Sequence, residues 1–389
     1  MKSYKYGLFH YNTENIGDEI QSIAARRFLP KIDYYFDRDD IDATVVKSGE
    51  KVKLIMNGWY THKPELWPPK TKSIEPLLIS MFVEQTEGVN YSAKAFSSPE
   101  SVKFLNKFGP VGARDLSSRD FFNSIGVESY FSGCLTLTLI ADKRVKKQDF
   151  ILAVDVSDAV YNKISSLTDR KIVRLDTYRL SDLTYDEKFK LAEYWLMLYQ
   201  SAHVVVTPRL HCMLPCLALE TPVIAISGRD PRRYNGLIDL TNHYAEEEFI
   251  DKSFKYDFEH PVSNPTKYKE LRKNVEEKCS TYTGFDSKAS YIAKTNPEEL
   301  LFDPSLLNVL GKSVAGGFEL DEIRKEQKTI RETLAKEEAQ FNKRIATLVR
   351  QNEELTERNI ELENLGIKGS AVRLVRANKN FIKKKFGKK

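Results

Sequence analysis

Three residues in the middle of the chain, Arg209, Leu210 and His211, combine a fixed positive charge with a side chain that titrates near neutral pH. The β-branched run at 204–206 before them predicts a buried strand, and the almost wholly apolar run at 212–219 predicts a buried helix. The first N–H groups of a helix lack partners within it and attract anions. Arg209 adds charge there, and His211 can give or take a proton. The segment predicts a site for a small anionic substrate; a structural histidine beside a buried ion pair is the alternative.

Arg114 stands in a similar place, because it follows the short strand candidate at 110–113. Its planar guanidinium suits a carboxylate or a phosphate. Ser117 is a candidate cap for the helix expected next. The alternative reading of Arg114 is an ion pair with Asp115.

A third basic segment lies at 228–236, after the strand candidate at 223–226. It contains Arg229, Arg232 and Arg233. Because the carboxyl ends of parallel strands meet at one edge of a sheet, we expect these arginines to form a second basic wall of the same cleft. A solvated arginine loop is the alternative.

Two polar segments of the N-terminal half complete the candidate site. One of them lies between a strand candidate and a helix candidate and contains Asn15, Gly17 and Asp18. Gly17 permits a close approach of the backbone to a ligand. The positive N-terminal end of the helix dipole favours the carboxylate of Asp18. Asn57 and Trp59 end another strand candidate, and the indole could stack on a sugar. These residues are candidates for an acceptor or cleft role; a capped helix start and core packing are the alternatives.

No metal site is expected. Cys212 and Cys216 lie close to His211, but one face of one helix supplies too few ligands, and no CxxC pair occurs elsewhere. The four cysteines form no disulfide framework, which favours a reducing, cytoplasmic setting. We expect no signal segment at the N-terminus, and no apolar run reaches 18 residues.

The elements that must position these residues alternate between strands and helices, which is typical of parallel sheets covered by helices. The charged stretch at 142–149 interrupts this alternation, and the pattern restarts after it. We therefore predict an α/β fold with two doubly wound halves, at 1–145 and 146–315. The cleft between them is the expected site.

A different composition begins near 316. Apolar residues recur every seven positions among Glu, Lys, Arg, Gln and Asn, which predicts a coiled-coil helix at 316–365, and two asparagines on its seam favour a homodimer. A long solvated helix is the alternative. The repeating column consists of Leu320, Gln327, Leu334, Phe341, Leu348, Leu355 and Leu362.

The last segment, 366–389, carries nine Lys or Arg and no acid. Removing these nine charges from the net charge of +5 leaves the remainder at −4, so the basic character belongs to this tail. Apolar residues interleaved with basic ones suit an anionic membrane surface rather than nucleic acid. A solubilising tail without a partner is the alternative.

Together, these segments resemble the polysaccharide pyruvyl transferase family over about residues 1–250. No single motif is specific, but their order is. The matching segments are Asn15-Ile16-Gly17-Asp18-Glu19, Val111-Gly112-Ala113-Arg114-Asp115 with Ser117-Ser118, Arg209-Leu210-His211, and Leu217-Ala218-Leu219-Glu220-Thr221-Pro222-Val223-Ile224-Ala225-Ile226.

The resemblance implies two Rossmann-like domains in a GT-B-like arrangement, with 1–145 on the acceptor side and 146–315 on the donor side. It also implies transfer of the enolpyruvyl unit of phosphoenolpyruvate onto a pair of sugar hydroxyls. It implies that Arg114 and Arg209 hold the donor's carboxylate and phosphate, with Arg233 or its neighbour Arg232 as a further basic residue. His211 would be the general acid or base. The chain departs from the family pattern at 57–60, where many members have glycines, and at 133–134, where many have Asp-Pro.

We therefore expect a cytoplasmic pyruvyl transferase that forms a pyruvate ketal on an oligosaccharide or lipid-linked precursor of a surface polysaccharide. It would need no metal and no organic cofactor, because phosphoenolpyruvate is itself the donor. The coiled coil would form a homodimer, and the tail would hold the enzyme at the inner face of the membrane. The alternatives are a GT-B-type glycosyltransferase that uses a nucleotide sugar and a non-catalytic coiled-coil scaffold in a glycan-assembly complex.

Overall fold

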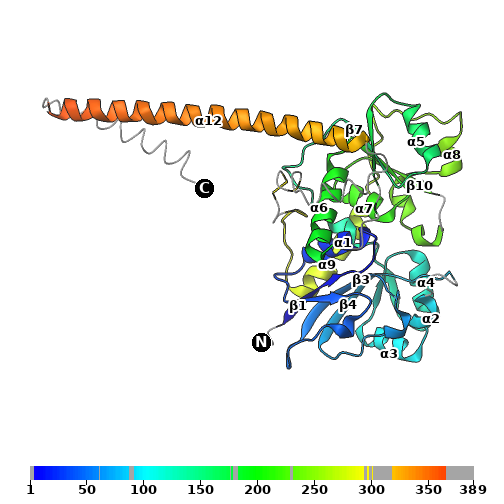
Figure 1. The fold of residues 1–389 in the computed structure, drawn as a ribbon. Coiled ribbons are helices and arrows are strands. Elements are labelled where there is room, and N and C mark those ends of the chain that lie inside the picture. Colours follow the sequence, from blue (N-terminus) through cyan, green and yellow to red (C-terminus); the bar gives the residue numbers. More distant parts are fainter. Residues whose placement is uncertain are drawn as a thin grey trace. The chain divides into compact units, whose positions relative to one another are not determined.

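The computed structural model describes residues 4–60, 62–86, 92–175, 177, 183–227, 231–292, 296–297, 300 and 318–364. It divides into two compact units, Met1–Leu320 and Asp321–Lys389. We call the first unit the body (Figure 1). Arg229 and the basic tail at 366–389 lie outside the described residues.

The first half of the body contains a six-stranded sheet in the order β2-β1-β3-β4-β5-β6, with every pair of neighbours parallel. Its strands are β1 (Lys5–His10), β2 (Tyr34–Asp37), β3 (Val52–Trp59), β4 (Ile74–Phe82), β5 (Val111–Ala113) and β6 (Ser129–Phe131). Its helices are α1 (Gly17–Arg26), α2 (Ser92–Phe96), α3 (Pro99–Phe108) and α4 (Leu116–Ser124), with short 3-10 turns η1 (Ile41–Ala43), η2 (Pro64–Leu66) and η3 (Leu135–Thr138).

The second half contains a five-stranded sheet in the order β11-β10-β9-β7-β8, again parallel throughout. The expected α/β fold with two parallel sheets is therefore confirmed. The strands are β7 (Phe150–Val154), β8 (Lys171–Leu175), β9 (Val204–Thr207), β10 (Val223–Ser227) and β11 (Asn242–Ala245). The helices are α5 (Asp158–Ser165), α6 (Tyr185–Ser201), α7 (Leu210–Ala218), α8 (Glu246–Ile250) and α9 (Tyr268–Thr283), with η4 (Pro231–Tyr234) and η5 (Ile238–Leu240).

Helices α1, α6 and α7 lie between the two sheets and contact one another (Figure 1). Their apolar side chains form one buried cluster that includes Ile20 of α1, Trp195 of α6 and Met213 of α7. A shared core of this kind holds the two halves together by burial of apolar surface. It also brings the N-terminal ends of α1 and α7 to the same region, and this arrangement builds the site.

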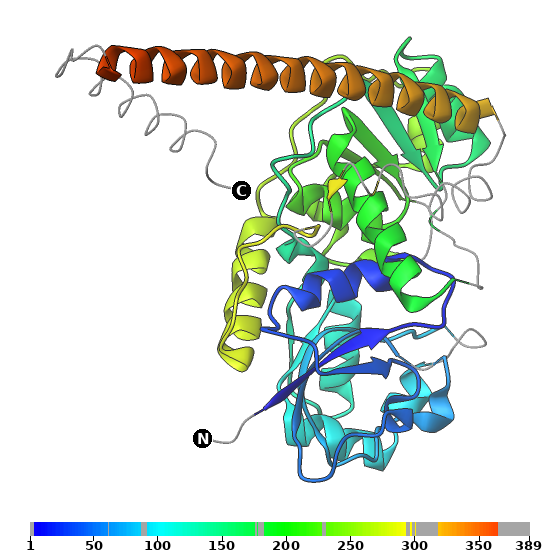
Figure 2. The same ribbon diagram turned by 60° about the vertical axis from the view of Figure 1, so that its left-hand side comes forward.

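The chain returns to the first half at α9, which sequence patterns did not indicate. The helix runs beside the first sheet (Figure 2). The Tyr282 hydroxyl accepts a 2.8 Å hydrogen bond from the Leu54 amide, and the Lys53 ammonium bonds to the Tyr282 carbonyl. Residues late in the chain therefore support the half that holds its beginning.

Helix α1 and strand β3 end at defined residues. Helix α1 ends at Arg26, because the amides of Phe28 and Leu29 bond to carbonyls three residues back and so form a tighter turn. Strand β3 extends to Trp59, and the Trp59 ring lies under the Arg233 guanidinium of the site.

The described residues of the second unit belong to the 47-residue helix α12 (Phe318–Asn364). Apolar side chains of the predicted seam are exposed on it, with Phe341 at 56%, Leu348 at 49% and Leu355 at 51%. The helix agrees with the sequence pattern, and its pairing in a coiled coil stays a prediction. Within the described ranges, no helix is both long and apolar enough to cross a bilayer.

Candidate functional site

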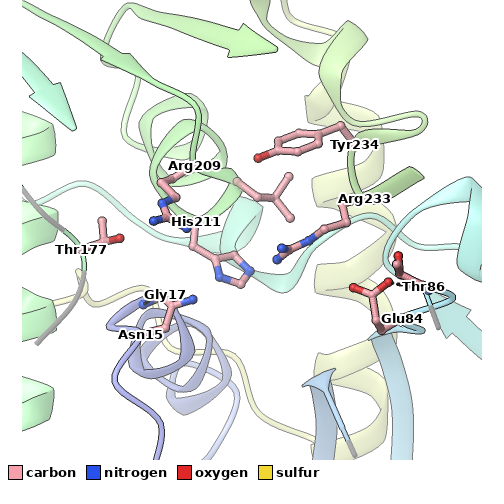
Figure 3. A pocket seen from close by; sticks show the side chains of 10 residues that line it. Asn15, Gly17, Glu84, Thr86, Thr177, Arg209, His211, Arg233 and Tyr234 are labelled. Atoms are coloured by element: carbon pink, nitrogen blue, oxygen red, sulfur yellow. Dashed lines mark hydrogen bonds between the residues drawn. The ribbon is translucent and has the colours of Figure 1, made fainter. Parts of the chain in front are cut away.

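A pocket of about 240 Å³ lies where the two halves meet (Figure 3). It is smaller than the roughly 300–1,000 Å³ typical of sites for drug-sized ligands, which favours a small substrate. Helix heads and strand ends supply its walls, as expected for parallel sheets. The lining residues are Asn15, Gly17, Glu84, Thr86, Thr177, Arg209, Leu210, His211, Arg233 and Tyr234.

Arg209 and His211 enter this pocket from the head of α7. Val204–Thr207 is a buried strand and α7 is a buried helix, as the apolar pattern predicts. Arg209 is the N-cap residue, with extended backbone, and its amide donates to Thr207 Oγ1 at 3.0 Å. His211 has non-helical angles (φ −83°, ψ 16°) within the first turn. This irregular head presents both side chains to the pocket instead of continuing the helix smoothly.

The charge of Arg209 is held by Asp155, which directly follows β7. Arg209 Nε donates to Asp155 Oδ2 at 2.6 Å. Asp155 also accepts from the Thr177 amide at 3.0 Å and from the Thr177 hydroxyl. The ion-pair alternative for Arg209 is thus present, yet the same arginine lines the pocket, so both readings of the segment apply.

His211 is the most strongly perturbed titratable group of the pocket. Burial, followed by the positive charges of Arg114 and Arg233, lowers the pKa of His211 to about 3. Its Nε2 atom is buried and has no hydrogen-bond partner in the described part of the chain. The imidazole is therefore neutral at pH 7. A strongly shifted group in a pocket is a candidate for catalysis.

Gly17 is required because it faces His211 directly. A Cβ at position 17 would lie 2.6 Å from His211 Nδ1 and 2.9 Å from His211 Cβ. The Gly17 amide donates to Asn15 Oδ1 at 3.0 Å. The head of α1 thus packs closely against the head of α7, and Asn15 lines the same pocket.

The basic segment at 228–236, called the arginine loop from here on, contributes Arg233 to the pocket. Its guanidinium carbon lies 5.2 Å from the centre of the Trp59 ring and 5.5 Å from that of Phe82. Stacking on two aromatic faces orients the charge at little cost in desolvation. The Arg232 side chain does not follow that of Arg233, because its Nη2 donates to Thr86 Oγ1 at 2.6 Å. Only Arg233 of this pair lines the pocket.

Arg114 is not among the lining residues. Its side chain is 1% exposed, its guanidinium carbon lies 3.9 Å from the centre of the Phe82 ring, and its Nη2 is 3.4 Å from Asp115 Oδ2. Burial lowers the pKa of Arg114, and burial raises the pKa of Asp115. After burial, the positive charge of Arg114 is the largest cause of the low pKa of His211.

The cap predicted next to Arg114 is wrong. Helix α4 begins with Asp115 as its N-cap, and Asp115 Oδ1 accepts from the Ser118 amide at 2.8 Å. Ser117 lies one position inside the helix. A carboxylate is favoured at this end because it faces the positive end of the helix dipole.

Two predicted cleft residues lie behind the pocket. Asp18 is buried and pairs with Arg38 at 3.2 Å. Burial alone would raise the pKa of Asp18, but Arg38 and the 2.6 Å bond from Thr13 hold it below its usual range. Asn57 is also buried, at 1% exposure, and does not line the pocket. Both residues belong to the layer that supports the pocket.

Sequence reasoning missed several pocket residues. Glu84 and Thr86 follow β4, and Thr177 follows β8, whereas Asp155, which follows β7, does not line the pocket but pairs with Arg209. Each stands just beyond a carboxyl end, so the rule that identified Arg114 would also have identified them. Tyr234 belongs to the arginine loop, and its hydroxyl donates a hydrogen bond to the Pro208 carbonyl, which fixes its position. No group of three or more metal-ligating side chains occurs among the described residues.

Comparisons with known proteins follow the same segments. The family model for polysaccharide pyruvyl transferase matches residues 15–230, a range that spans parts of both sheets and includes Asn15, Arg209 and His211. A search of curated proteins found no match.

Three solved structures show weak likeness to the chain. A functionally uncharacterised protein from Klebsiella pneumoniae is 15% identical with a TM-score of 0.38, covering 61% of this chain and 89% of its own. The wall teichoic acid polymerase TagF with CDPG is 12% identical with a TM-score of 0.32, covering 83% and 89%. The E. coli heptosyltransferase WaaC with ADP is 12% identical with a TM-score of 0.23, covering 58% and 88%.

Proposed function

Because this chain belongs to the polysaccharide pyruvyl transferase family, we propose that it moves the enolpyruvyl unit of phosphoenolpyruvate onto two sugar hydroxyls of a polysaccharide precursor. The products would be a pyruvate ketal and phosphate. The observation that carries this proposal is the pocket in which Arg209, His211 and Arg233 face one small cavity.

The charge of the pocket suits this donor. Phosphoenolpyruvate has about three negative charges near neutral pH, one from its carboxylate and up to two from its phosphate. Arg209 and Arg233 enter from opposite walls, and Arg114 adds a buried charge nearby. We propose that the two pocket arginines bind the donor's carboxylate and phosphate, and that Arg114 raises the local positive potential. Fixed cations of this kind stabilise a departing phosphate without reorganisation.

His211 is the proposed acid and base. The reaction protonates the methylene carbon of the donor, and one sugar hydroxyl attacks the resulting cationic centre as it loses its proton. The C–O bond to phosphate then breaks, phosphate leaves, and the second hydroxyl attacks the same carbon and loses its proton, which closes the ketal. His211 is neutral in the free protein, because burial, Arg114 and Arg233 all disfavour the imidazolium. A bound trianion offsets those positive charges and favours a protonated ring. We therefore propose that donor binding loads His211 with the proton that it then delivers.

The acceptor side is proposed to lie towards Asn15, Gly17 and Trp59. Trp59 has part of its ring under Arg233, so a sugar stacked there would be close to the donor. No metal or organic cofactor enters this proposal. We further propose that α12 pairs two chains and that the tail at 366–389 contacts an anionic membrane surface near a lipid-linked acceptor.

We expect purified protein to release phosphate from phosphoenolpyruvate only when a suitable glycan is present. We also expect saturating phosphoenolpyruvate to raise the melting temperature, because a ligand at about 100 times its Kd stabilises the folded state by about 2.7 kcal/mol. A thermal-shift assay with and without nucleoside diphosphates checks this. Stabilisation by a nucleoside diphosphate and none by phosphoenolpyruvate would instead support a nucleotide-sugar glycosyltransferase.

We expect the full chain to be a dimer with twice the chain mass of 44.8 kDa. Substituting Leu348→Gln together with Leu355→Gln should yield monomers, because both side chains are about half exposed on a lone helix and would be buried in a pair. Light scattering coupled to size exclusion measures this. The matched control is Arg350→Gln with Glu357→Gln, which changes exposed residues on the opposite side of the helix and should leave the dimer intact. A monomeric wild type would contradict the coiled coil.

A further inference from the structure

Asp155 occupies a position in the backbone that few side chains tolerate. It is the first residue after β7, its φ is +52°, and its side chain is only 6% exposed. Left-handed backbone is uncommon outside glycine, although Asp and Asn adopt it more readily than most residues. Such positions concentrate at functional sites, where the surrounding structure maintains them. The strained geometry aims the Asp155 carboxylate at the pocket wall.

This carboxylate joins the ends of two strands to the head of α7. Oδ2 accepts from Arg209 Nε at 2.6 Å, and Oδ1 accepts from the Thr177 amide at 3.0 Å. The Asp155 amide donates to the Leu175 carbonyl at 2.9 Å, which fixes its own position. Nε is the guanidinium nitrogen nearest the backbone, so a hydrogen bond there sets the plane and direction of the whole guanidinium group.

The same carboxylate is linked to the other half of the body. The Thr177 carbonyl accepts from the Ile16 amide at 3.1 Å, and Ile16 is the N-cap of α1. Thr177 itself lines the pocket. Asp155 thus fixes Arg209 on one side and, through Thr177, the head of α1 on the other.

We propose that Asp155 is a positioning residue that orients the Arg209 guanidinium towards the donor anion and holds the heads of α7 and α1 at one spacing. This inference rests on the proposed function for the identity of the donor, but not for the geometry. A carboxylate beside an anion site repels the anion, so it weakens binding unless its effect on orientation outweighs its charge. The proposal states that orientation dominates.

Whether Asp155→Asn strengthens or weakens the binding of phosphoenolpyruvate tests this statement. Asp155→Asn keeps the size and the tolerance for left-handed backbone, but removes the negative charge that fixes Arg209. If Asp155 only neutralised Arg209, phosphoenolpyruvate would bind more tightly to the variant. If Asp155 positions Arg209, phosphoenolpyruvate should bind about tenfold or more weakly, because loss of orientation by an ångström is costly at a bidentate site.

Isothermal titration of phosphoenolpyruvate and of inorganic phosphate into the full-length proteins supplies the measurement. Inorganic phosphate is nearly isotropic, so its binding depends less on the direction of the Arg209 guanidinium. Its affinity for Asp155→Asn should therefore stay unchanged or increase. The control is Asp158→Asn, which loses the same charge three residues away from an exposed pair with Arg174. We expect this control to change both affinities by less than about twofold.

Arg209→Lys provides a second variant in case Asp155→Asn folds poorly. It keeps the charge but loses the Nε–H donor, so it should weaken phosphoenolpyruvate binding to a similar degree, and the double variant should add little. Unchanged or tighter binding to Asp155→Asn, or additive effects, would overturn the positioning role. A wild type that binds inorganic phosphate but not phosphoenolpyruvate would overturn the proposed donor alone. The positioning role would then be decided by a double-mutant cycle of Asp155→Asn and Arg209→Lys on the free energy of unfolding, where additive costs would show that the carboxylate does not hold Arg209. A wild type that binds neither anion overturns both.

Discussion

His211→Ala should lower phosphate release from phosphoenolpyruvate by about 10²–10⁴-fold, the usual contribution of a positioned acid or base. The loss should appear in kcat, because Arg209 and Arg233 would still bind the donor. Steady-state phosphate release with saturating donor and acceptor measures it. Turnover within a few fold of wild type would exclude His211 as the group that moves the proton.

Because the pKa of His211 is low in the free protein, the same variant also reports on proton uptake when the donor binds. The free protein has a pKa of about 3 at this residue, so the ring is neutral from pH 5 to 8. Binding of an anion beside it raises this pKa, and the complex then takes up a proton from solution. We expect uptake to increase as the pH falls from 7 towards 5. Calorimetry in buffers with different ionisation enthalpies detects it, and the difference from His211→Ala removes the donor's own ionisation.

Gly17→Ala should have the second-largest effect, although it adds only a methyl group. At the start of an undisturbed helix this exchange would stabilise the protein by about 0.4–1 kcal/mol. Here the new Cβ would meet His211 Nδ1 at 2.6 Å and His211 Cβ at 2.9 Å, so the two helix heads must separate. We expect a loss of about 1–3 kcal/mol in the free energy of unfolding and a large fall in kcat. Chemical denaturation and the phosphate assay measure the two quantities.

A double-mutant cycle separates this contact from a general effect on α1. When His211 is already alanine, Gly17→Ala should cost less stability, because the contact with the imidazole Nδ1 at 2.6 Å is gone and only the contact with the Cβ at 2.9 Å remains. Equal costs in both backgrounds would show that the contact of Gly17 with the His211 ring does not limit the packing. A stabilised single variant would contradict the geometry directly.

The sequence was informative wherever a pattern is local. Runs of β-branched residues and the apolar stretch after His211 depend only on the period of a strand or a helix, and they placed β9 and α7 correctly. The rule that ligands gather at the carboxyl ends of parallel strands then identified Arg209, His211 and the arginine loop. The ordered motifs indicated the family, and the match over residues 15–230 confirms it.

Side-chain direction was not accessible in this way. Arg114 and Arg233 are both arginines beyond strand ends, yet Arg114 is buried against Phe82 and Arg233 lines the pocket. Arg232 and Arg233 are adjacent, and one turns to Thr86 while the other faces the pocket. Such choices depend on rotamers and on neighbours far away in the chain, which no local pattern encodes.

The amino-acid sequence by itself thus determined the strand β9, the helix α7, the family and the chemical types present at Arg209 and His211. Only the tertiary structure decided that Gly17 touches His211, that Asp155 holds Arg209, and that α9 returns to support the first half. The physical reason is separation along the chain. Contacts between residues 17 and 211 arise from the shared core of α1, α6 and α7, whose packing is a property of the whole body rather than of any segment.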